Sequence, residues 1–402
     1  MDVRLSEKIS GGKVTLPPLK SAAGLYFILA ALSCGETVIE TKTPPDEIFV
    51  IASCLKALGA SVTPASGGYR VTPVALRDTA DKSPELDVEN SAFALKTLLP
   101  VSLAVSSAAN FCGGKSLSKK SLAVMLSSFK SAGYTSENLP LTVNGTLAPG
   151  KYEVGAEAGA HFLGGLLIAL SVLDGDSAVY AEKGLCDKQF INETVSAIKS
   201  FGGEAARTEY GFNVKGGGLV SPGRVTVPCD FYGAFPFIAL NEFYGGVSFK
   251  GDYEISASAN HALTCLKEIR IRGGGKYKVS SFDAVCVLLA AACLTRGETE
   301  FEFGGSFTPK DAERAERLVI AANKSGFNAS FYNGGVKIIS DGVARGGVIV
   351  DCYGDYRAAI FASLVAVGAE RPVTLLSVDA LKKTYPEFFN DLIKLGAKAE
   401  TL

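Results

Sequence analysis

The chain repeats one pattern of apolar and polar positions: an amphipathic helix that ends at a glycine, then a strand, a turn and a second strand. The pattern is found six times, at 54–73, 127–145, 197–216, 266–279, 321–340 and 391–402. The glycines that end these helices are Gly59, Gly133, Gly202, Gly273, Gly326 and Gly396. Glycine favours the left-handed conformation that closes many helices, so the spacing has a structural cause. A period of about 70 residues is too long for a solenoid.

A second kind of helix alternates with the first and has no polar face. Alanine-rich helices end in glycine and lead into strands, clearly at 32–40, 172–180 and 294–302 and more loosely at 366–376. A helix that is apolar all round is predicted to be buried, with amphipathic helices and sheets outside it. The combined pattern predicts an α/β fold of six βαβαββ-like units, three in each of two domains.

Composition narrows the functional classes. The 402 residues include 40 Lys and Arg against 41 Asp and Glu, so no overall field attracts nucleic acid or an anionic membrane. The longest apolar run, 285–294, is too short to span a bilayer, and the polar start is unlike a signal peptide. Nine cysteines without a CxxC pair and only two histidines predict reduced core thiols and no metal site. We expect a cytoplasmic protein.

Charged residues gather where the alanine-rich helices begin. These are Lys20 with Ser21, Asp283, Asp355 with Arg357, the group Lys310, Asp311 and Arg314, and, in a shorter segment, Lys382 and Lys383. Free backbone N–H groups at a helix start, joined by Lys or Arg, make an anion site. Taken singly, Asp283 and Asp355 are more typical of N-caps, and Lys310 and Arg314 of an ion-pair network along one helix. Lys96 lies in an apolar run and needs an anionic partner.

These residues, in this order, carry a resemblance to a known family. The segment 309–318, "PKDAERAERL", resembles a K-E-[ST]-D-R motif, and 355–367 resembles D-H-R-x-A-M with Tyr356 for the His. The segment 382–397 resembles K-T-F/Y-P-x-F followed by L-x-x-L-G. The chain therefore resembles the enolpyruvyl transferase family over its whole length, and within it the 5-enolpyruvylshikimate-3-phosphate synthases.

The resemblance implies a two-domain inside-out α/β barrel with six βαβαββ-like repeats. One domain would comprise 1–18 plus 229–402 and carry most phosphoenolpyruvate contacts. The other, 19–228, would carry most acceptor contacts. The implied reaction transfers the enolpyruvyl group of phosphoenolpyruvate to the 5-hydroxyl of shikimate-3-phosphate and releases phosphate. The resemblance further implies a monomer that uses no cofactor.

Matching positions imply the site residues. Catalytic roles fall to Asp283, Asp311 and Lys20. Phosphoenolpyruvate contacts fall to Lys20, Lys96, Arg314, Arg357 and Lys383. Acceptor contacts fall to Ser21, His161, Asp283 and Lys310.

The acceptor half departs from the family motifs. Leu25 replaces the Arg of K-S-x-[ST]-x-R, and Gly159-Ala160-His161-Phe162 replaces S-S-Q-[FY]. Lys115, Lys119 or Lys120 could supply the lost positive charge. Two alternatives therefore stay open beside the synthase: an enolpyruvyl transferase with a different acceptor, and a non-catalytic homologue that binds an anionic ligand.

Overall fold

The computed structural model describes residues 1–41, 46–74, 83–119, 121–129, 132–182, 188–251, 253, 255–279, 281–304, 309–332 and 334–402, without the side chains of 46, 188, 309, 310 and 383. The chain forms two compact units. Unit 1 comprises Met1–Pro17 and Pro228–Leu402, and unit 2 comprises Pro18–Val227. These bounds lie one residue from the predicted 1–18 plus 229–402 and 19–228. Which unit holds which substrate stays a prediction.

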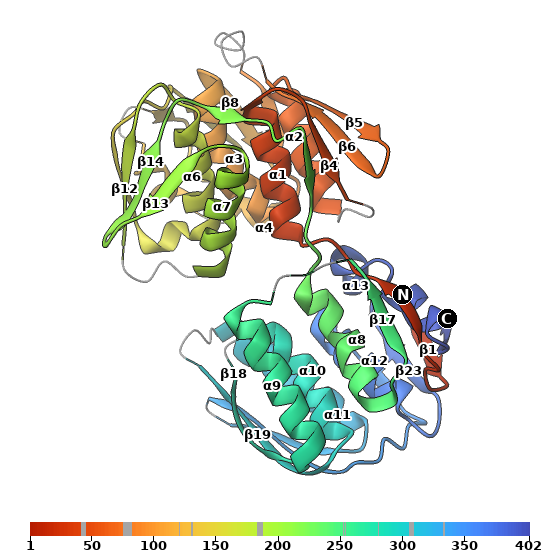
Figure 1. The fold of residues 1–402 in the computed structure, drawn as a ribbon. Coiled ribbons are helices and arrows are strands. Elements are labelled where there is room, and N and C mark those ends of the chain that lie inside the picture. The colour runs from red at the N-terminus through yellow and green to blue at the C-terminus, as the bar shows by residue number, and fades with distance from the viewer. Residues whose placement is uncertain are drawn as a thin grey trace. The chain divides into compact units, whose positions relative to one another are not determined.

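Unit 2 contains three four-stranded sheets with the same order: two parallel strands, then two antiparallel ones (Figure 1). In sheet order, the strands are β16 (Arg224–Thr226), β4 (Thr37–Glu40), β6 (Gly68–Thr72), β5 (Ser61–Ala65); β7 (Glu85–Asp87), β8 (Ala108–Cys112), β10 (Leu141–Asn144), β9 (Gly133–Tyr134); and β11 (Lys151–Val154), β12 (Ser177–Ala181), β14 (Gly211–Lys215), β13 (Glu204–Arg207). A short parallel pair joins β3 (Ser33–Cys34) to β15 (Leu219–Val220).

The helices of unit 2 fall into the two kinds that the sequence predicts. The inner helices α1 (Lys20–Leu32), α3 (Ala92–Val105) and α6 (Ala160–Ser171) are buried on nearly every side. The others are α2 (Asp46–Ala57), α4 (Lys115–Ser118), α5 (Ala123–Leu126), the 3-10 turn η1 (Ala156–Ala158) and α7 (Lys188–Ser200). Because the inner helices have no polar face, they pack against one another and under the sheets.

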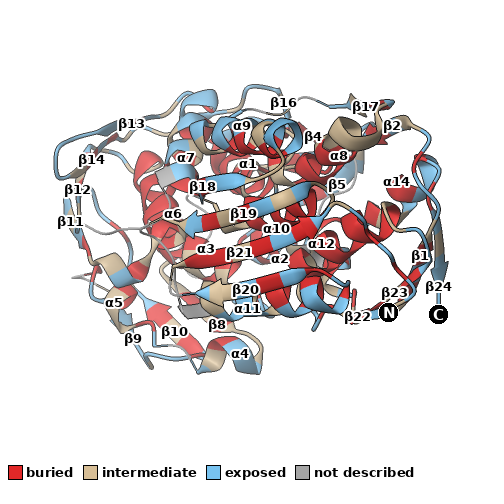
Figure 2. Cartoon of the chain, turned by 90° about the horizontal axis from the view of Figure 1, so that it is seen from below, coloured by how far each residue is buried: buried red, intermediate tan, exposed pale blue. Residues whose placement is uncertain are grey.

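Unit 1 has two sheets of the same order and one shorter sheet. The full sheets are β22 (Ile349–Asp351), β23 (Val373–Leu376), β1 (Val3–Ser6), β24 (Lys398–Thr401); and β18 (Gly275–Val279), β19 (Arg296–Phe303), β21 (Gly335–Asp341), β20 (Asn328–Tyr332). The third sheet pairs β17 (Val247–Lys250) with β2 (Gly12–Thr15). The helices are α8 (Phe231–Tyr244), α9 (Ala257–Arg272), α10 (Phe282–Cys293), α11 (Pro309–Lys324), α12 (Tyr356–Val367), α13 (Ala380–Thr384) and α14 (Phe388–Lys394). Figure 2 shows α10 and α12 buried along most of their length.

The prediction that a glycine ends the helix is confirmed at five of the six positions, with Gly273 as the C-cap of α9. Gly59, Gly202, Gly326 and Gly396 follow α2, α7, α11 and α14 with positive φ. The prediction for Gly133 is wrong, because it lies in β9, seven residues after α5 ends at Leu126.

The copy predicted at 266–279 is only partly correct. Gly273 caps α9 in the left-handed conformation (φ 73°, ψ 28°). No hairpin follows, however. The strand β18 begins two residues later and pairs in parallel with β19, so that it belongs to the sheet formed with β19, β21 and β20. The sixth unit, which consists of β2, α8, β17 and α9, is therefore truncated within the described residues, and its sheet is limited to β17 and β2.

Inner helices α3 and α6 approach closely at a glycine. A Cβ added at Gly165 would lie 2.3 Å from the carbonyl oxygen of Thr97. Gly165→Ala should therefore lower the free energy of unfolding by about 1–3 kcal/mol, because backbone must shift to accept the methyl group. Urea denaturation measures the change.

Gly133→Ala is the matched control, since a Cβ at that exposed position meets nothing within 4 Å. Its effect should stay within about 0.5 kcal/mol. A stabilised Gly165→Ala variant would show that α3 and α6 tolerate a wider separation.

Candidate functional site

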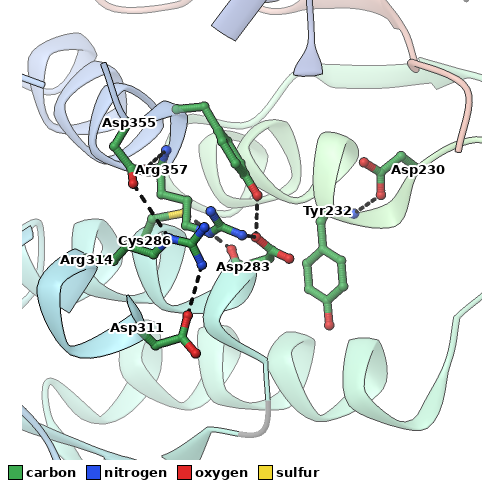
Figure 3. Close-up of polar contacts among 9 residues, drawn as sticks. Asp230, Tyr232, Asp283, Cys286, Asp311, Arg314, Asp355 and Arg357 are labelled. Carbon is green, nitrogen blue, oxygen red and sulfur yellow. Dashed lines mark hydrogen bonds and ion pairs between the residues drawn. The ribbon is translucent and has the colours of Figure 1, made fainter. Parts of the chain in front are cut away.

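The beginnings of inner helices α10 and α12 carry a compact charged cluster in unit 1. Asp283 lies in the first turn of α10, where Ser281 is the N-cap, so the prediction of Asp283 as an N-cap is wrong. Its Oδ1 forms an ion pair with the guanidinium of Arg357, and it accepts a hydrogen bond from the Tyr356 hydroxyl at 2.5 Å. The two donors thus hold one carboxylate oxygen in place, as Figure 3 shows for Arg357.

Tyr356 remains a hydrogen-bond donor in this cluster. Burial, and then the charge of Asp283, raise the pKa of its phenol well above the ordinary value. The guanidinium of Arg357 lies 4.2 Å from the centre of the Tyr356 ring, a distance at which a cation and an aromatic face attract. The family motif has His at this position, so a group that titrates near neutral pH has been replaced by one that does not.

Arg357 is a buried cation with capacity left for another partner. The residue is 9% exposed, and its Nε has no hydrogen-bond partner among the described residues. Burial opposes its charged form, yet Asp283 and the other negative neighbours raise the pKa of the guanidinium. An ionised, incompletely bonded guanidinium is suited to bind an anion.

A second arginine is held beside the first by two carboxylates (Figure 3). Arg314 on α11 donates to Asp311 at 2.9 Å and lies 3.8 Å from Asp355. Asp355 also caps α12 by accepting the backbone N–H of Arg357 at 2.8 Å, so its predicted N-cap role is confirmed. Of the ion-pair network predicted on α11, the contact between Asp311 and Arg314 is present, and the side chain of Lys310 lies outside the described residues.

A cavity of about 290 Å³ opens over this cluster. It is lined by Glu313, Arg314, Arg317, Gly354, Asp355, Tyr356 and Arg357. Three of these side chains are guanidiniums, and the first residues of α12 form part of the wall. The lining is chemically suited to an anionic ligand with several oxygens.

The nearby cysteine is not a nucleophile. Cys286 donates to the backbone oxygen of Asp283 at 3.3 Å, and burial raises the pKa of its thiol to about 12. Cys54 and Cys293 are likewise buried and free, as predicted. Among the described residues, no group of three or more His, Cys, Asp or Glu side chains is arranged to hold a metal ion.

In unit 2, the start of α1 is tied to two glutamates. Lys20 forms an ion pair with Glu47 at 2.7 Å, and the hydroxyl of Ser91 also donates to Glu47. Ser21 donates to Glu193 of α7 at 2.7 Å. The predicted lysine and serine thus lie together at a helix start, and both face carboxylates that the sequence interpretation missed.

Two further predicted residues lie near each other in unit 2. Lys96 donates to the backbone oxygen of Ala158 at 2.9 Å, directly before the start of α6. His161, in the first turn of α6, packs edge to face with Phe190 at 4.6 Å and with Phe93 at 5.1 Å. Leu25, which replaces the family arginine, is fully buried.

Some predicted residues lie outside what the structure describes. The side chains of Lys310 and Lys383 are not described, and neither is Lys120. Lys115 and Lys119 are exposed at the short helix α4. The sequence interpretation also missed Arg317. This residue could have been predicted to lie beside Arg314, because the two are three positions apart in a helical segment.

Within the described part of the chain, no helix is long and apolar enough to cross a membrane.

A family model described as EPSP synthase (3-phosphoshikimate 1-carboxyvinyltransferase) matches residues 4–247 and 278–392. The unmatched stretch between them contains α9.

Curated relatives and solved structures agree with this match. The chain is 26% identical to a 3-phosphoshikimate 1-carboxyvinyltransferase of Clostridium botulinum (strain Eklund 17B / Type B), over 96% of this chain and 95% of the relative. It is 27% identical to one of Clostridium perfringens (strain 13 / Type A), over 96% of each. Its fold resembles an EPSP synthase from Acinetobacter baumannii (TM-score 0.82, 16% identity, all of both chains).

A further structural neighbour is the enolpyruvyl transferase NikO from Streptomyces tendae (TM-score 0.73, 16% identity, 99% of this chain and 98% of that one). These neighbours confirm the predicted two-domain α/β fold class. Because the family model covers most of both units, the chain belongs to the EPSP synthase family.

Proposed function

We propose that this protein transfers the enolpyruvyl group of phosphoenolpyruvate to the 5-hydroxyl of shikimate-3-phosphate and releases phosphate. The observation that carries the proposal is the Asp283 carboxylate, fixed by Arg357 and Tyr356 beside a cavity lined by guanidiniums. A base next to an anion site is what the reaction requires. Family membership supplies the identity of the two small-molecule substrates.

The addition step needs a base and an acid. The acceptor oxygen bonds to C2 of phosphoenolpyruvate, its proton leaves, and C3 gains a proton to become a methyl group. Asp283 is the proposed base, because the ion pair and the hydrogen bond of its carboxylate both fall on Oδ1, and Oδ2 remains for the acceptor hydroxyl. Asp311 is the residue that we propose to lie near C3, the carbon that gains the proton.

The elimination step reverses the proton movement at C3. The C3 methyl loses a proton, the C2–C3 double bond re-forms, and the C2–O bond to phosphate breaks. In this proposal, Arg314 and Arg357 stabilise the negative charge of the phosphoenolpyruvate moiety in both steps. Lys20, Lys96 and Lys383 stay predicted ligands of phosphoenolpyruvate, and Ser21, His161 and Lys310 stay predicted ligands of the acceptor.

A second candidate is an enolpyruvyl transferase with a different acceptor. Glu193 places negative charge against Ser21, a predicted ligand of the acceptor, and Glu47 is paired with the neighbouring Lys20, whereas shikimate-3-phosphate itself carries a carboxylate and a phosphate. Leu25, which replaces the family arginine, cannot donate a charge-assisted hydrogen bond to the acceptor. Each such bond that is lost weakens acceptor binding by roughly 1.5–3 kcal/mol. This candidate predicts an acceptor with less negative charge.

Phosphate release from phosphoenolpyruvate tests the function directly. We expect release only when shikimate-3-phosphate is also present, because the phosphate leaves from the adduct of both substrates. A continuous phosphate assay with each substrate alone, and with both, measures it.

Replacing shikimate-3-phosphate with shikimate separates the two candidates. Release with shikimate but not with its 3-phosphate would favour the second candidate. Phosphoenolpyruvate binding without release for either acceptor would favour the non-catalytic alternative. We expect a monomer, which sedimentation would test.

A further inference from the structure

We propose that Arg317 is a further phosphoenolpyruvate-binding residue, which supplies a third guanidinium to the anion site of unit 1. The inference rests on the proposed function and deepens it. The family motif K-E-[ST]-D-R corresponds to 310–314 and ends at Arg314. No motif residue therefore corresponds to Arg317.

Arg317 lies on the same face of α11 as Arg314. Residues three apart on a helix are neighbours, one turn from each other. Both line the cavity of about 290 Å³, together with Arg357 from α12. Arg317 is partly buried, and it lines the cavity.

The three guanidiniums differ in what already binds them. Arg314 is engaged by Asp311 and Asp355, and Arg357 is engaged by Asp283. None of the ion pairs between described residues includes Arg317. Arg317 is therefore the guanidinium of the cavity with most of its donors left for a ligand.

A second observation also points to an anionic ligand. The Nε of Arg357 lacks a partner among the described residues although the residue is 9% exposed. A buried donor without an acceptor costs free energy, and an oxygen of a bound ligand would satisfy it. Among the residues that line the cavity, the guanidiniums are those of Arg314, Arg317 and Arg357, and the carboxylates are those of Glu313 and Asp355.

Phosphoenolpyruvate offers two anionic groups, a phosphate and a carboxylate. Both accept paired hydrogen bonds from a guanidinium, so either could face Arg317. Arg317 would bind one of these two groups, and titration with compounds that carry only one of them distinguishes the phosphate from the carboxylate.

Calorimetric titration with phosphoenolpyruvate, without acceptor, tests the assignment. We expect R317Q to raise the Kd by about 10- to 100-fold, since it removes a charge-assisted contact. R317K should recover part of the affinity, because it restores the charge without the fork of donors. K324Q removes the same charge from the exposed far end of α11 and should leave the Kd unchanged.

Titration with inorganic phosphate and with pyruvate identifies the group. A weaker phosphate affinity in R317Q, with pyruvate unchanged, places Arg317 on the phosphate, and the opposite result places it on the carboxylate. An R317Q variant that keeps its melting temperature and binds phosphoenolpyruvate like the wild type overturns the inference.

The inference and the proposed function fail in different ways. Arg317-dependent binding of phosphoenolpyruvate, without phosphate release for any acceptor, refutes the function and leaves the inference standing. Turnover by the wild type, with equal phosphoenolpyruvate affinity in R317Q, refutes only the inference. A wild type that binds none of the three probes overturns both.

Discussion

Replacing Asp283 with asparagine should lower kcat for phosphate release by about 10²- to 10⁴-fold, the range typical of losing a general base. Asparagine keeps the size of the side chain and still accepts a hydrogen bond from Tyr356, but it takes no proton from an acceptor hydroxyl. Asp283 does not itself line the cavity, whereas Arg357, which it contacts, does and is unchanged in this variant. Phosphoenolpyruvate binding should therefore be retained. Steady-state phosphate release and calorimetry measure the two effects separately.

The matched control is Asp341→Asn in the same unit. Asp341 is an exposed carboxylate that also pairs with an arginine, Arg345, and it does not line the cavity. Its loss should leave kcat unchanged. If Asp283→Asn retains most of the wild-type kcat, the base must be another group, and the proposed mechanism would have to be abandoned.

The layering of the fold follows from local sequence patterns. The segments that became α1, α10 and α12 have no polar face, so burial was the only stable outcome, and the structure confirms it. The truncated sixth unit could not be predicted in the same way. Residues 266–279 show a helix, a glycine and a strand, as the other copies do, but whether β18 pairs within its own unit depends on β19, farther along the chain.

The candidate site shows the same division between local and distant information. Charges at helix starts indicated Asp283, Arg314 and Arg357, which the structure brings together. The distinction between a cap and a functional group was not visible for Asp283, because Ser281 takes the N-cap two residues earlier. Glu193 was missed because its partner Ser21 lies 172 residues away in the chain.

Replacing Arg357 with glutamine should both destabilise unit 1 and weaken phosphoenolpyruvate binding. Removing one partner of a fully buried ion pair costs about 3–5 kcal/mol. Here we expect about 1–3 kcal/mol, because the side chain of Asp283 is 34% exposed and water can solvate the carboxylate left behind. Urea denaturation measures the loss, and we expect the Kd for phosphoenolpyruvate to rise by about 100-fold.

The double variant Arg357→Gln with Asp283→Asn separates the structural role of the arginine from its role in binding. Once Asp283 is uncharged, no carboxylate remains without its ion-pair partner, so part of the lost free energy of unfolding should return. Phosphoenolpyruvate affinity should not return, because the guanidinium that binds the ligand is still missing. Recovery of both quantities together would mean that Arg357 only neutralises Asp283, and that the anion is held by Arg314 and Arg317 alone.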